Sequence, residues 1–290
     1  TSPLTNITNT KLLCCQSITS ATEAAVTPNS ITVNGGCSPT SINPFDAFSK
    51  DGVGYMSASA AGITDGTVSL TGASINTKAG FSIVTYCGHS NGNTTFGHGL
   101  SQAPEIWINK SRDNSENWRV YYTTADGSYD FMYLNTTGAV NHSGYALPTS
   151  TVINKADDVN EKMIAYCWHS VPGYSKMGSY QGNGNVDGKF VYTGFRPAFI
   201  MMKETTDSST NWVIYDNKRG ANTYNPVDVN SYPNLNNAEG DASLDYDFVS
   251  NGFKVRTNNG GINANDQVYI YMAFAEQPSP NQYGAQSNAR

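Results

Sequence analysis

Charged side chains are scarce in this chain of 290 residues: Asp, Glu, Lys and Arg make up 14%, and the formal net charge is −6. A protein that binds nucleic acid normally carries a basic stripe, so this acidic balance argues against a nucleic-acid partner. No apolar run approaches the roughly 20 residues that a membrane-spanning helix needs, and no membrane span is expected. The first residues, TSPLTNITNT, also lack the basic and then apolar pattern of a signal peptide.

Cysteine is sparse as well, with five residues and no CxxC pair. An odd, widely spaced set is typical of free thiols rather than of a disulfide framework or a zinc site. We interpret these cysteines as mostly buried thiols of a protein that folds in a reducing cytoplasm. The alternative is a single bridge from Cys37 to Cys14 or Cys15.

The chain is rich in turn formers and aromatics, with 32 Asn, 27 Gly and 18 Tyr. Helix signals are weak and confined to residues 20–26 and 154–166, and the second of these is interpreted as a loop that leads into a strand. Short segments rich in Val, Ile, Tyr and Phe recur between clusters of Gly, Asn, Asp and Pro. This spacing is typical of antiparallel sandwiches and barrels. We therefore predict an all-β fold.

An internal repeat organises most of the chain. NWRVYYT at 117–123 and NWVIYDN at 211–217 lie 94 residues apart, and the similarity extends over 85–122 and 179–216. Further along, Leu134-Asn135 matches Leu235-Asn236, and IAYC at 164–167 matches MAFA at 272–275. The repeat predicts two related antiparallel β-sandwich-like modules.

The repeat also sets the expected boundaries along the chain. Residues 79–173 and 174–278 are the two modules, here called repeat 1 and repeat 2. Residues 1–78 are predicted to be a β-rich connector that packs on a neighbour or completes a fold begun upstream, and residues 279–290 a loose tail rich in Pro, Gln and Asn.

Trp118 and Trp212 occupy the same position in the two repeats. An aromatic face can stack on a sugar, but both residues lie within alternating apolar strand segments. We interpret both as core anchors.

Other patterns could carry chemistry, but each has a simpler interpretation. GHSNG at 88–92 matches a nucleophile elbow without the helix that the motif requires. His89 and His98 could meet across a hairpin and bind a metal, yet repeat 2 has no matching histidines. Asp241, Asp245 and Asp247 could serve a glycosidase or bind calcium, although no complete calcium loop accompanies them. We predict no catalytic residues, no metal, no cofactor and no enzymatic activity.

Ligand contacts are expected where the repeats differ, because loops that vary on a scaffold often carry binding. The long insertion at 217–234 in repeat 2 is such a loop. Its polar and aromatic residues Tyr224, Asn225, Tyr232 and Asn234 are the predicted contacts.

Several stretches resemble known proteins. KLLCCQSITSATEAAVTPNSITVNGG (11–36) resembles the end of a laminin-G/concanavalin-A-like module in long virion proteins of marine tailed phages. Residues 80–113, 169–203 and 251–278 resemble the repeated β-module that follows it there. The resemblance implies a virion structural protein: a tail-fibre, tail-tip or capsid-surface fibre subunit that binds the host and forms homotrimers.

Three functions follow from these observations. The first is a non-enzymatic fibre or surface subunit of the virion, folded in the bacterial cytoplasm, that binds a host surface glycan or protein. The second is a purely structural capsid decoration or fibre-anchor protein that contacts neighbouring virion proteins. The third is a polysaccharide-degrading tailspike, which would need a carboxylate pair in a groove.

Overall fold

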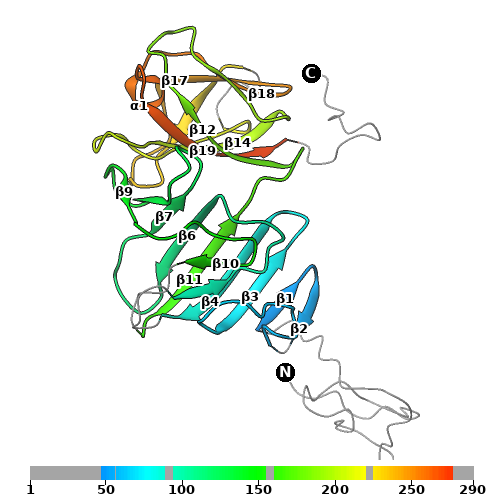
Figure 1. The fold of residues 1–290 in the computed structure, drawn as a ribbon. Helices are drawn as coiled ribbons and strands as arrows, with labels where there is room; N and C mark the ends of the chain where they lie inside the picture. The colour runs from blue at the N-terminus through cyan, green and yellow to red at the C-terminus, as the bar shows by residue number, and fades with distance from the viewer. Residues whose placement is uncertain (1–46, 56, 89–93, 155–159, 220–224, 277–290) are drawn as a thin grey trace, which may run out of the picture.

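The computed structural model describes residues 47–55, 57–88, 94–154, 160–219 and 225–276, and for 241–245 the backbone alone. Nearly all regular structure in these residues is β, which confirms the predicted all-β class (Figure 1). One short helix, α1 (Gly260–Asn263), occurs among them, and Asn259 caps it by accepting a hydrogen bond from the amide of Gly261. Within the same residues, no helix is long and apolar enough to cross a membrane.

The strands form two large sheets and a separate pair. The first sheet has the order β2-β1-β3-β4-β11-β6-β7-β8-β9, and β5 pairs with β10 beside it. The strands of this sheet and of the separate pair are β1 (Phe48–Lys50), β2 (Val53–Tyr55), β3 (Leu70–Asn76), β4 (Phe81–Cys87), β5 (Thr95–Gly97), β6 (Ile106–Ser111), β7 (Arg119–Tyr122), β8 (Asp130–Tyr133), β9 (Asn141–His142), β10 (Val152–Asn154) and β11 (Lys162–Trp168).

The second sheet has the order β12-β19-β14-β15-β16-β17-β18-β13. Its strands are β12 (Ser175–Gln181), β13 (Phe190–Tyr192), β14 (Pro197–Glu204), β15 (Val213–Asp216), β16 (Val227–Ser231), β17 (Gly240–Val249), β18 (Gly252–Val255) and β19 (Val268–Ala275). The central order β4-β11-β6-β7-β8 of the first sheet recurs as β12-β19-β14-β15-β16. In both sheets the last strand of the repeat (β11 or β19) lies between the first strand (β4 or β12) and the third (β6 or β14). The sequence repeat is therefore also a repeat of topology.

Strand pairing corrects two of the sequence matches. Tyr86 pairs with Met163, and its counterpart Tyr180 pairs with Tyr269. The strands β11 and β19 therefore correspond at an offset of 106, not the 108 that equates IAYC with MAFA. A slip of two residues keeps every side chain on the same face of a sheet, so an apolar pattern cannot detect it.

The second correction concerns the Asn after β8. The amide of Trp118 donates to Oδ1 of Asn135 at 3.0 Å, and the amide of Trp212 donates to Oδ1 of Asn234 at 3.1 Å. Asn234, rather than Asn236, is thus the counterpart of Asn135. Again the sequence match was two residues out.

The segment before repeat 1 belongs to the same sheet as repeat 1. β3 pairs antiparallel with β4, and β1 pairs in parallel with β3. A boundary at residue 78 therefore lies between two neighbouring strands of one sheet. Residues 1–46 and 277–290, with Cys14, Cys15 and Cys37, lie outside the described residues. Cys87 and Cys167 are free thiols, exposed and buried respectively.

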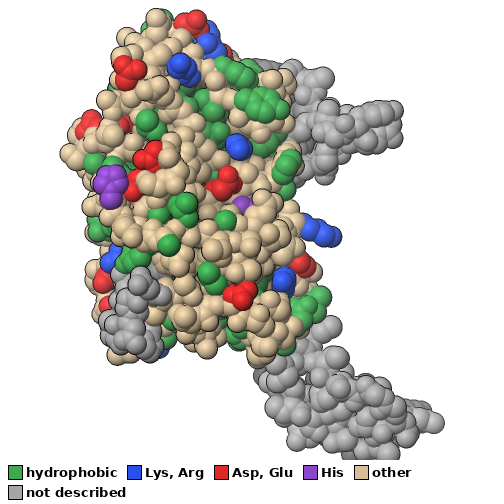
Figure 2. All heavy atoms as spheres, viewed as in Figure 1, with side chains coloured by type: hydrophobic (Ala, Val, Ile, Leu, Met, Phe, Trp, Pro, Cys, Tyr) green, Lys and Arg blue, Asp and Glu red, His purple; other side chains and the backbone are tan. Residues whose placement is uncertain are grey.

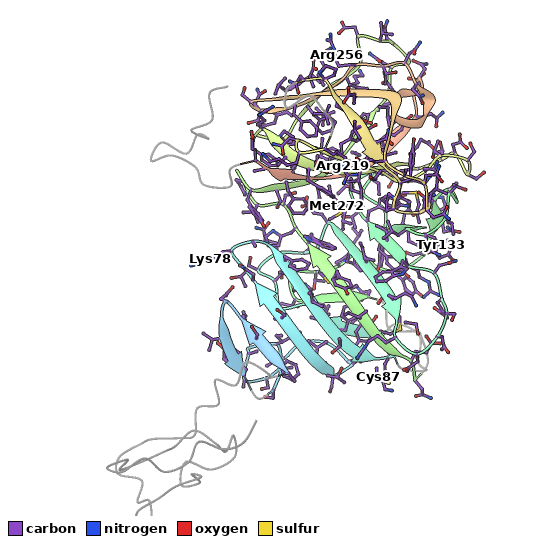
Figure 3. The ribbon with its side chains drawn as sticks, turned by 180° about the vertical axis from the view of Figure 1, so that it is seen from behind. Lys78, Cys87, Tyr133, Arg219, Arg256 and Met272 are labelled. Atoms are coloured by element: carbon purple, nitrogen blue, oxygen red, sulfur yellow. The ribbon has the colours of Figure 1, made fainter. Side chains whose placement is uncertain are left out.

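Each sheet has a core face and a back face. The core face of repeat 1 carries Trp107 and Tyr121, and that of repeat 2 carries Ile200 and Tyr215. The back faces meet in a third apolar cluster at the junction of the two repeats, where Met272 is labelled in Figure 3. The residues buried in it are Ile106, Ile108, Val120, Tyr122 and Met132 of repeat 1 and Met177, Met201, Trp212, Ile270 and Met272 of repeat 2.

The two tryptophans have different surroundings. Trp212 is 1% exposed in the junction, and its Nε1 donates to the carbonyl of Tyr133 at 2.9 Å, which confirms it as a packing anchor. Trp118 is 36% exposed, so its predicted core position is wrong. Both side chains are on back faces. Trp212 packs against repeat 1, whereas Trp118 is exposed to solvent.

Candidate functional site

The clearest difference between the repeats is a segment that only repeat 1 has. In repeat 1, β3 pairs with β4, and just before β3 the residue Val68 pairs in parallel with Phe96 of β5. The amide of Val68 donates to the carbonyl of Thr95 at 3.0 Å. One continuous stretch, 67–76, therefore pairs with both β4 and β5.

In repeat 2, the strands that correspond to β4 and β5 are β12 and β13, and they are the two ends of the eight-stranded sheet. Both line one cleft of about 640 Å³, which we call the seam cleft. The second sheet therefore curls until its ends face each other without joining, as in an open barrel. The residues around the seam cleft are Glu105, Thr123, Thr124, Lys176, Met177, Gly178, Ser179, Tyr180, Gln181, Lys189, Phe190, Val191, Tyr192 and Tyr271.

Two aromatic side chains of β13 are unusually open. Phe190 is 48% exposed and Tyr192 is 66% exposed, whereas Val191 between them is buried in the core of repeat 2. This alternation follows from the period of two of a strand. The matching residues of β5 are Thr95 and Gly97. A Cβ on Gly97 would lie 2.5 Å from Cγ2 of Ile63, so repeat 1 has no room there for a side chain.

The polar groups of the seam cleft are of both charges. Lys176 and Lys189 bring ammonium groups, and Glu105 brings a carboxylate that accepts from the amide of Ser170. Repeat 1 also supplies Thr124, whose carbonyl accepts from Oγ of Ser179 at 2.7 Å. The Ser179 bond holds the repeat-1 wall of the cleft against β12, whereas the Glu105 bond lies within repeat 1.

The floor of the seam cleft is tightly packed. A Cβ on Gly178 would lie 2.6 Å from Oη of Tyr271, so the ring of Tyr271 lies directly against the backbone of β12. Burial, and secondly the nearby charge of Glu105, raise the pKa of Tyr271 to about 12. Its phenol therefore stays protonated at neutral pH and is available as a hydrogen-bond donor.

Of the predicted contact residues that the structure describes, Asn225 and Tyr232 do not lie at one site. Asn225 and Tyr232 lie beyond opposite ends of β16, and Tyr224 is outside the described residues. Asn225 has a structural part: its Nδ2 donates to the carbonyl of Phe248, and its Oδ1 accepts from the amide of Phe248. Tyr232 lines a second cleft, of about 440 Å³, beside Asn211, which accepts from Nδ2 of Asn234 at 2.7 Å.

The structure describes only some of the other chemical candidates. His98 is fully buried; its Nδ1 accepts from the amide of Leu100 at 3.2 Å, and its Nε2 lies 3.2 Å from the carbonyl of Thr149. Burial is the main cause that lowers the pKa of His98 to about 4, so the ring is neutral. His89 and residues 89–92 of the GHSNG motif are outside the described residues. Among those described, no group of three His, Cys, Asp or Glu residues could hold a metal ion.

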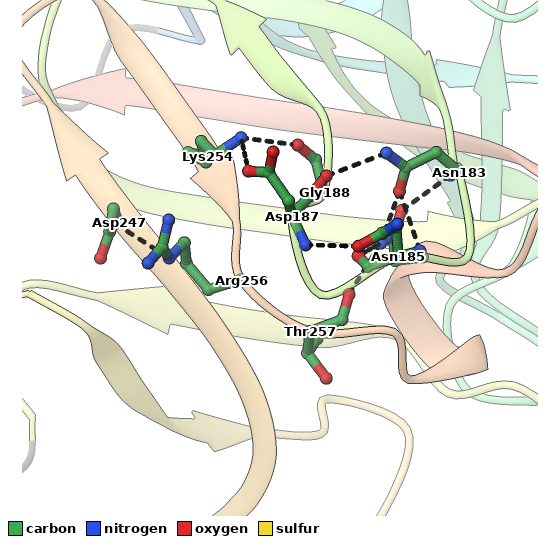
Figure 4. Close-up of polar contacts among 9 residues, drawn as sticks. Asn183, Asn185, Asp187, Gly188, Asp247, Lys254, Arg256 and Thr257 are labelled. Atoms are coloured by element: carbon green, nitrogen blue, oxygen red, sulfur yellow. Dashed lines mark hydrogen bonds and ion pairs between the residues drawn. The ribbon is translucent and has the colours of Figure 1, made fainter.

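Of the acidic cluster, Asp247 pairs with Nε of Arg256 at 3.3 Å, and the side chains of Asp241 and Asp245 are not described. Figure 4 shows this pair beside a loop, Asn183–Gly188, whose side-chain oxygens alternate as in calcium loops. Here, however, the ammonium of Lys254 lies 2.6 Å from Oδ1 of Asp187 and 2.9 Å from the carbonyl of Gly188. The positive charge beside this loop is therefore the ammonium of Lys254 rather than a calcium ion. Its hydrogen bond lowers the pKa of Asp187.

Sequence reasoning missed the seam cleft, although a signal was present. The segment KFVYT alternates Phe190 and Tyr192 around Val191, and TTFGH of repeat 1 has Thr and Gly in their places. The exchange of small for aromatic residues indicates that these two positions are packed against the chain in repeat 1 and open to solvent in repeat 2. The opposing strand β12 could not have been found this way, because its place in the cleft depends on the curl of the sheet.

The face of the molecule drawn in Figure 2 carries its charges singly, between uncharged side chains and backbone. A family model described as a domain of unknown function, DUF7483, matches residues 49–278. That range spans both repeats and all of residues 67–76, the segment that completes repeat 1. The chain matches no curated protein and no solved structure.

Proposed function

Because the chain belongs to the DUF7483 family, whose description assigns no function, we propose from the geometry of the seam cleft that it is a non-enzymatic binding protein. Its ligand is a polyhydroxylated surface molecule, a glycan of the host envelope, held between β12 and β13. The observation that carries this proposal is the open seam of repeat 2, at the place where repeat 1 is filled by residues 67–76.

The residues around the cleft suit a sugar ligand. The exposed rings of Phe190 and Tyr192 can stack on the C–H faces of a pyranose. The hydroxyl of Thr123 can exchange hydrogen bonds with sugar hydroxyls, and Oγ of Ser179, which donates to Thr124, can still accept one, as adaptable polar contacts do in wet interfaces. Two lysines against one glutamate favour a sugar that carries a carboxylate or another acidic group.

The resemblance to virion proteins supplies the biological setting of the proposal. In that setting the chain is a fibre or surface subunit of a tailed phage, which assembles in the host cytoplasm with copies of itself and neighbouring virion proteins. Several seam clefts in one oligomer would add avidity to weak single contacts. The alternative of a purely structural decoration protein is supported by the apolar back face described below.

The test is binding of the full chain to host cells and to a panel of neutral and acidic glycans. The double variant F190A/Y192A should lose binding by at least about tenfold, because stacking contacts of this kind are worth more than about 1.4 kcal/mol together. Its fold should be unchanged, since both side chains are open to solvent.

Val186 is the matched control, because it is 62% exposed in the neighbouring loop and lies outside the seam cleft. V186A should bind as the original chain does. K176Q/K189Q should weaken acidic glycans selectively. The proposal fails if the chain binds neither cells nor glycans, or if F190A/Y192A binds normally.

A further inference from the structure

Repeat 2 docks on repeat 1 through a patch on its back face. The patch comprises one residue of β12, one of β14, one before β15 and two of β19, all buried at the junction: Met177, Met201, Trp212, Ile270 and Met272. We call it the docking patch. It covers the apolar residues of β6, β7 and β8 on the back face of repeat 1.

Repeat 1 carries the same patch at equivalent positions. Strand pairing equates β4 with β12, β6 with β14, β7 with β15 and β11 with β19. The residues that correspond to the docking patch of repeat 2 are therefore Ile83, Ile108, Trp118, Ile164 and Tyr166. All five are apolar or aromatic, so both repeats carry a hydrophobic surface at this place on the back face.

In repeat 1 most of this patch is open. Ile108 is buried because repeat 2 reaches it, but Ile83, Ile164 and Tyr166 are only half-buried, and Trp118 is 36% exposed. Figure 3 looks onto the back face of the repeat-1 sheet, which β5 and β10 do not cover. The equivalent Trp212 is only 1% exposed, because repeat 1 covers the docking patch of repeat 2.

The open patch is extended by aromatic neighbours. The ring centroid of Trp118 lies 6.4 Å from that of Tyr166, and Tyr166 lies 6.4 Å from Trp168. Trp168 in turn stacks on Phe81 at 4.8 Å. These rings run from β7 across β11 to β4 and are continuous with the buried junction. A contiguous apolar surface of this kind marks an interaction site.

We propose that this patch of repeat 1, with Trp118 at its β7 side, docks on a second copy of this chain. The occupant is inferred from the molecule itself, because the equivalent patch of repeat 2 is covered by a module of this same fold. A receiving surface is also present: Phe199, Ile214 and Phe274 lie half-buried on the back face of repeat 2, beside the junction cluster. Phe199 and Ile214 correspond to Ile106 and Val120, which receive the docking patch within one chain.

Contact between different patches on two copies is heterologous and builds rings or extended chains of modules rather than a closed dimer. The proposal does not depend on the seam cleft, whose lining contains none of the open residues of this patch. Loss of glycan binding and loss of self-association would therefore be separate outcomes.

The test is the mass of the full chain in solution, measured by sedimentation velocity and light scattering over a range of concentrations. The mass should rise with concentration above the 31.2 kDa of one chain. W118E should weaken the association at least about tenfold, because it places a charge in an apolar contact. V186E, a charge added at an exposed position away from the back face, should associate normally.

I83K on the neighbouring strand is a second variant with the same expected effect, should W118E fail to fold. Oxidative footprinting of the unmodified chain adds a measurement without mutation: Trp118 should become protected as concentration rises. A mass of one chain at every concentration would overturn the proposal. So would assembly that W118E and I83K leave unchanged, or a Trp118 equally reactive at all concentrations.

Discussion

Trp118 and Trp212 occupy the same position, just before equivalent strands, in two copies of one fold, yet one is open and the other is buried. Their local surroundings are alike. In each repeat the tryptophan amide donates to an Asn after the next strand, and that Asn donates to the Asn before the tryptophan, at 2.8 Å in repeat 1 and 2.7 Å in repeat 2. The difference arises from the partner module. Equivalent sequence thus secures equivalent backbone structure, but it does not determine which face is covered.

The same lesson applies to the sheet edges. β5 and β13 are equivalent strands, and residues 67–68 pair with β5 while β13 lines an open cleft. Repeat 1 therefore has a closed edge and an open patch around Trp118, whereas repeat 2 has an open edge and buries the equivalent patch against repeat 1. The open edge of repeat 2 and the open patch of repeat 1 differ in chemistry.

The largest expected effect is on the tryptophans. W212A should lower the free energy of unfolding by about 3–5 kcal/mol, because it leaves a cavity at the junction and removes the hydrogen bond from Nε1 to the carbonyl of Tyr133. W118A should cost less than about 1 kcal/mol, as exposed substitutions usually do. Denaturant unfolding of both variants measures the difference. Equal losses would mean that the two positions are equally buried in solution.

The second comparison is between His98 and its counterpart in repeat 2, Thr193. Nδ1 of His98 accepts a hydrogen bond from the amide of Leu100, and Oγ1 of Thr193 accepts one from the amide of Phe195. The pKa of His98 is about 4 in the fold and 6.5 as its usual value, so the unfolded chain binds more protons between these limits. Stability is therefore fully present above pH 6.5 and is lost as the pH falls towards 4.

The loss should be about 2–3 kcal/mol, at about 1.4 kcal/mol for each unit of pKa. Urea unfolding measured at intervals from pH 7 to pH 4 checks this. H98Q should be less stable at pH 7 but flatter across this window. A slope unchanged in H98Q would assign the acid sensitivity to other groups.

The third comparison is a matched pair on β5 and β13. G97A should lose about 1–3 kcal/mol, because a Cβ there lies 2.5 Å from Ile63 and 2.9 Å from the carbonyl of Asp65. Y192A should leave stability within about 0.5 kcal/mol, since its side chain is open to solvent. Thermal unfolding of the two variants side by side is sufficient. A stable G97A would show that segment 63–68 does not rest on β5.

The smallest expected effect concerns the Asn bridges. N234A should cost about 1–2 kcal/mol and N135A about 0.5–1 kcal/mol, because each leaves a tryptophan amide without its acceptor and only the repeat-2 bridge is partly buried. Chemical unfolding of both variants gives the ratio. N236A is the control and should be neutral; a larger loss there would restore the original sequence match.

Much of the fold could be predicted from the sequence. Short apolar segments between turn residues predicted the strands, and the Asn-Trp pairs predicted two related modules. The match of 164–167 was two residues out because a shift of two along a strand leaves the pattern of faces unchanged. The match of Leu134-Asn135 was two residues out because repeat 2 has Asn at both 234 and 236, on either side of Leu235. Trp118 was assigned to a core because alternation shows that a face is apolar, not that something covers it.

The candidate site was beyond prediction for a similar reason. Tyr232 and Asn225 are close in sequence but lie beyond opposite ends of β16. Lys176 and Tyr192 are in strands at the two ends of the second sheet, yet they line one cleft.

The sequence by itself determined the strands, their repeat and the bonds local to each turn, because these depend on residues close in the chain or on alternation along one strand. Only the tertiary structure decided which edge stays open and which back face is covered. Both depend on how the sheets curl and on how one module packs against the next, and these follow from contacts between residues far apart in the chain.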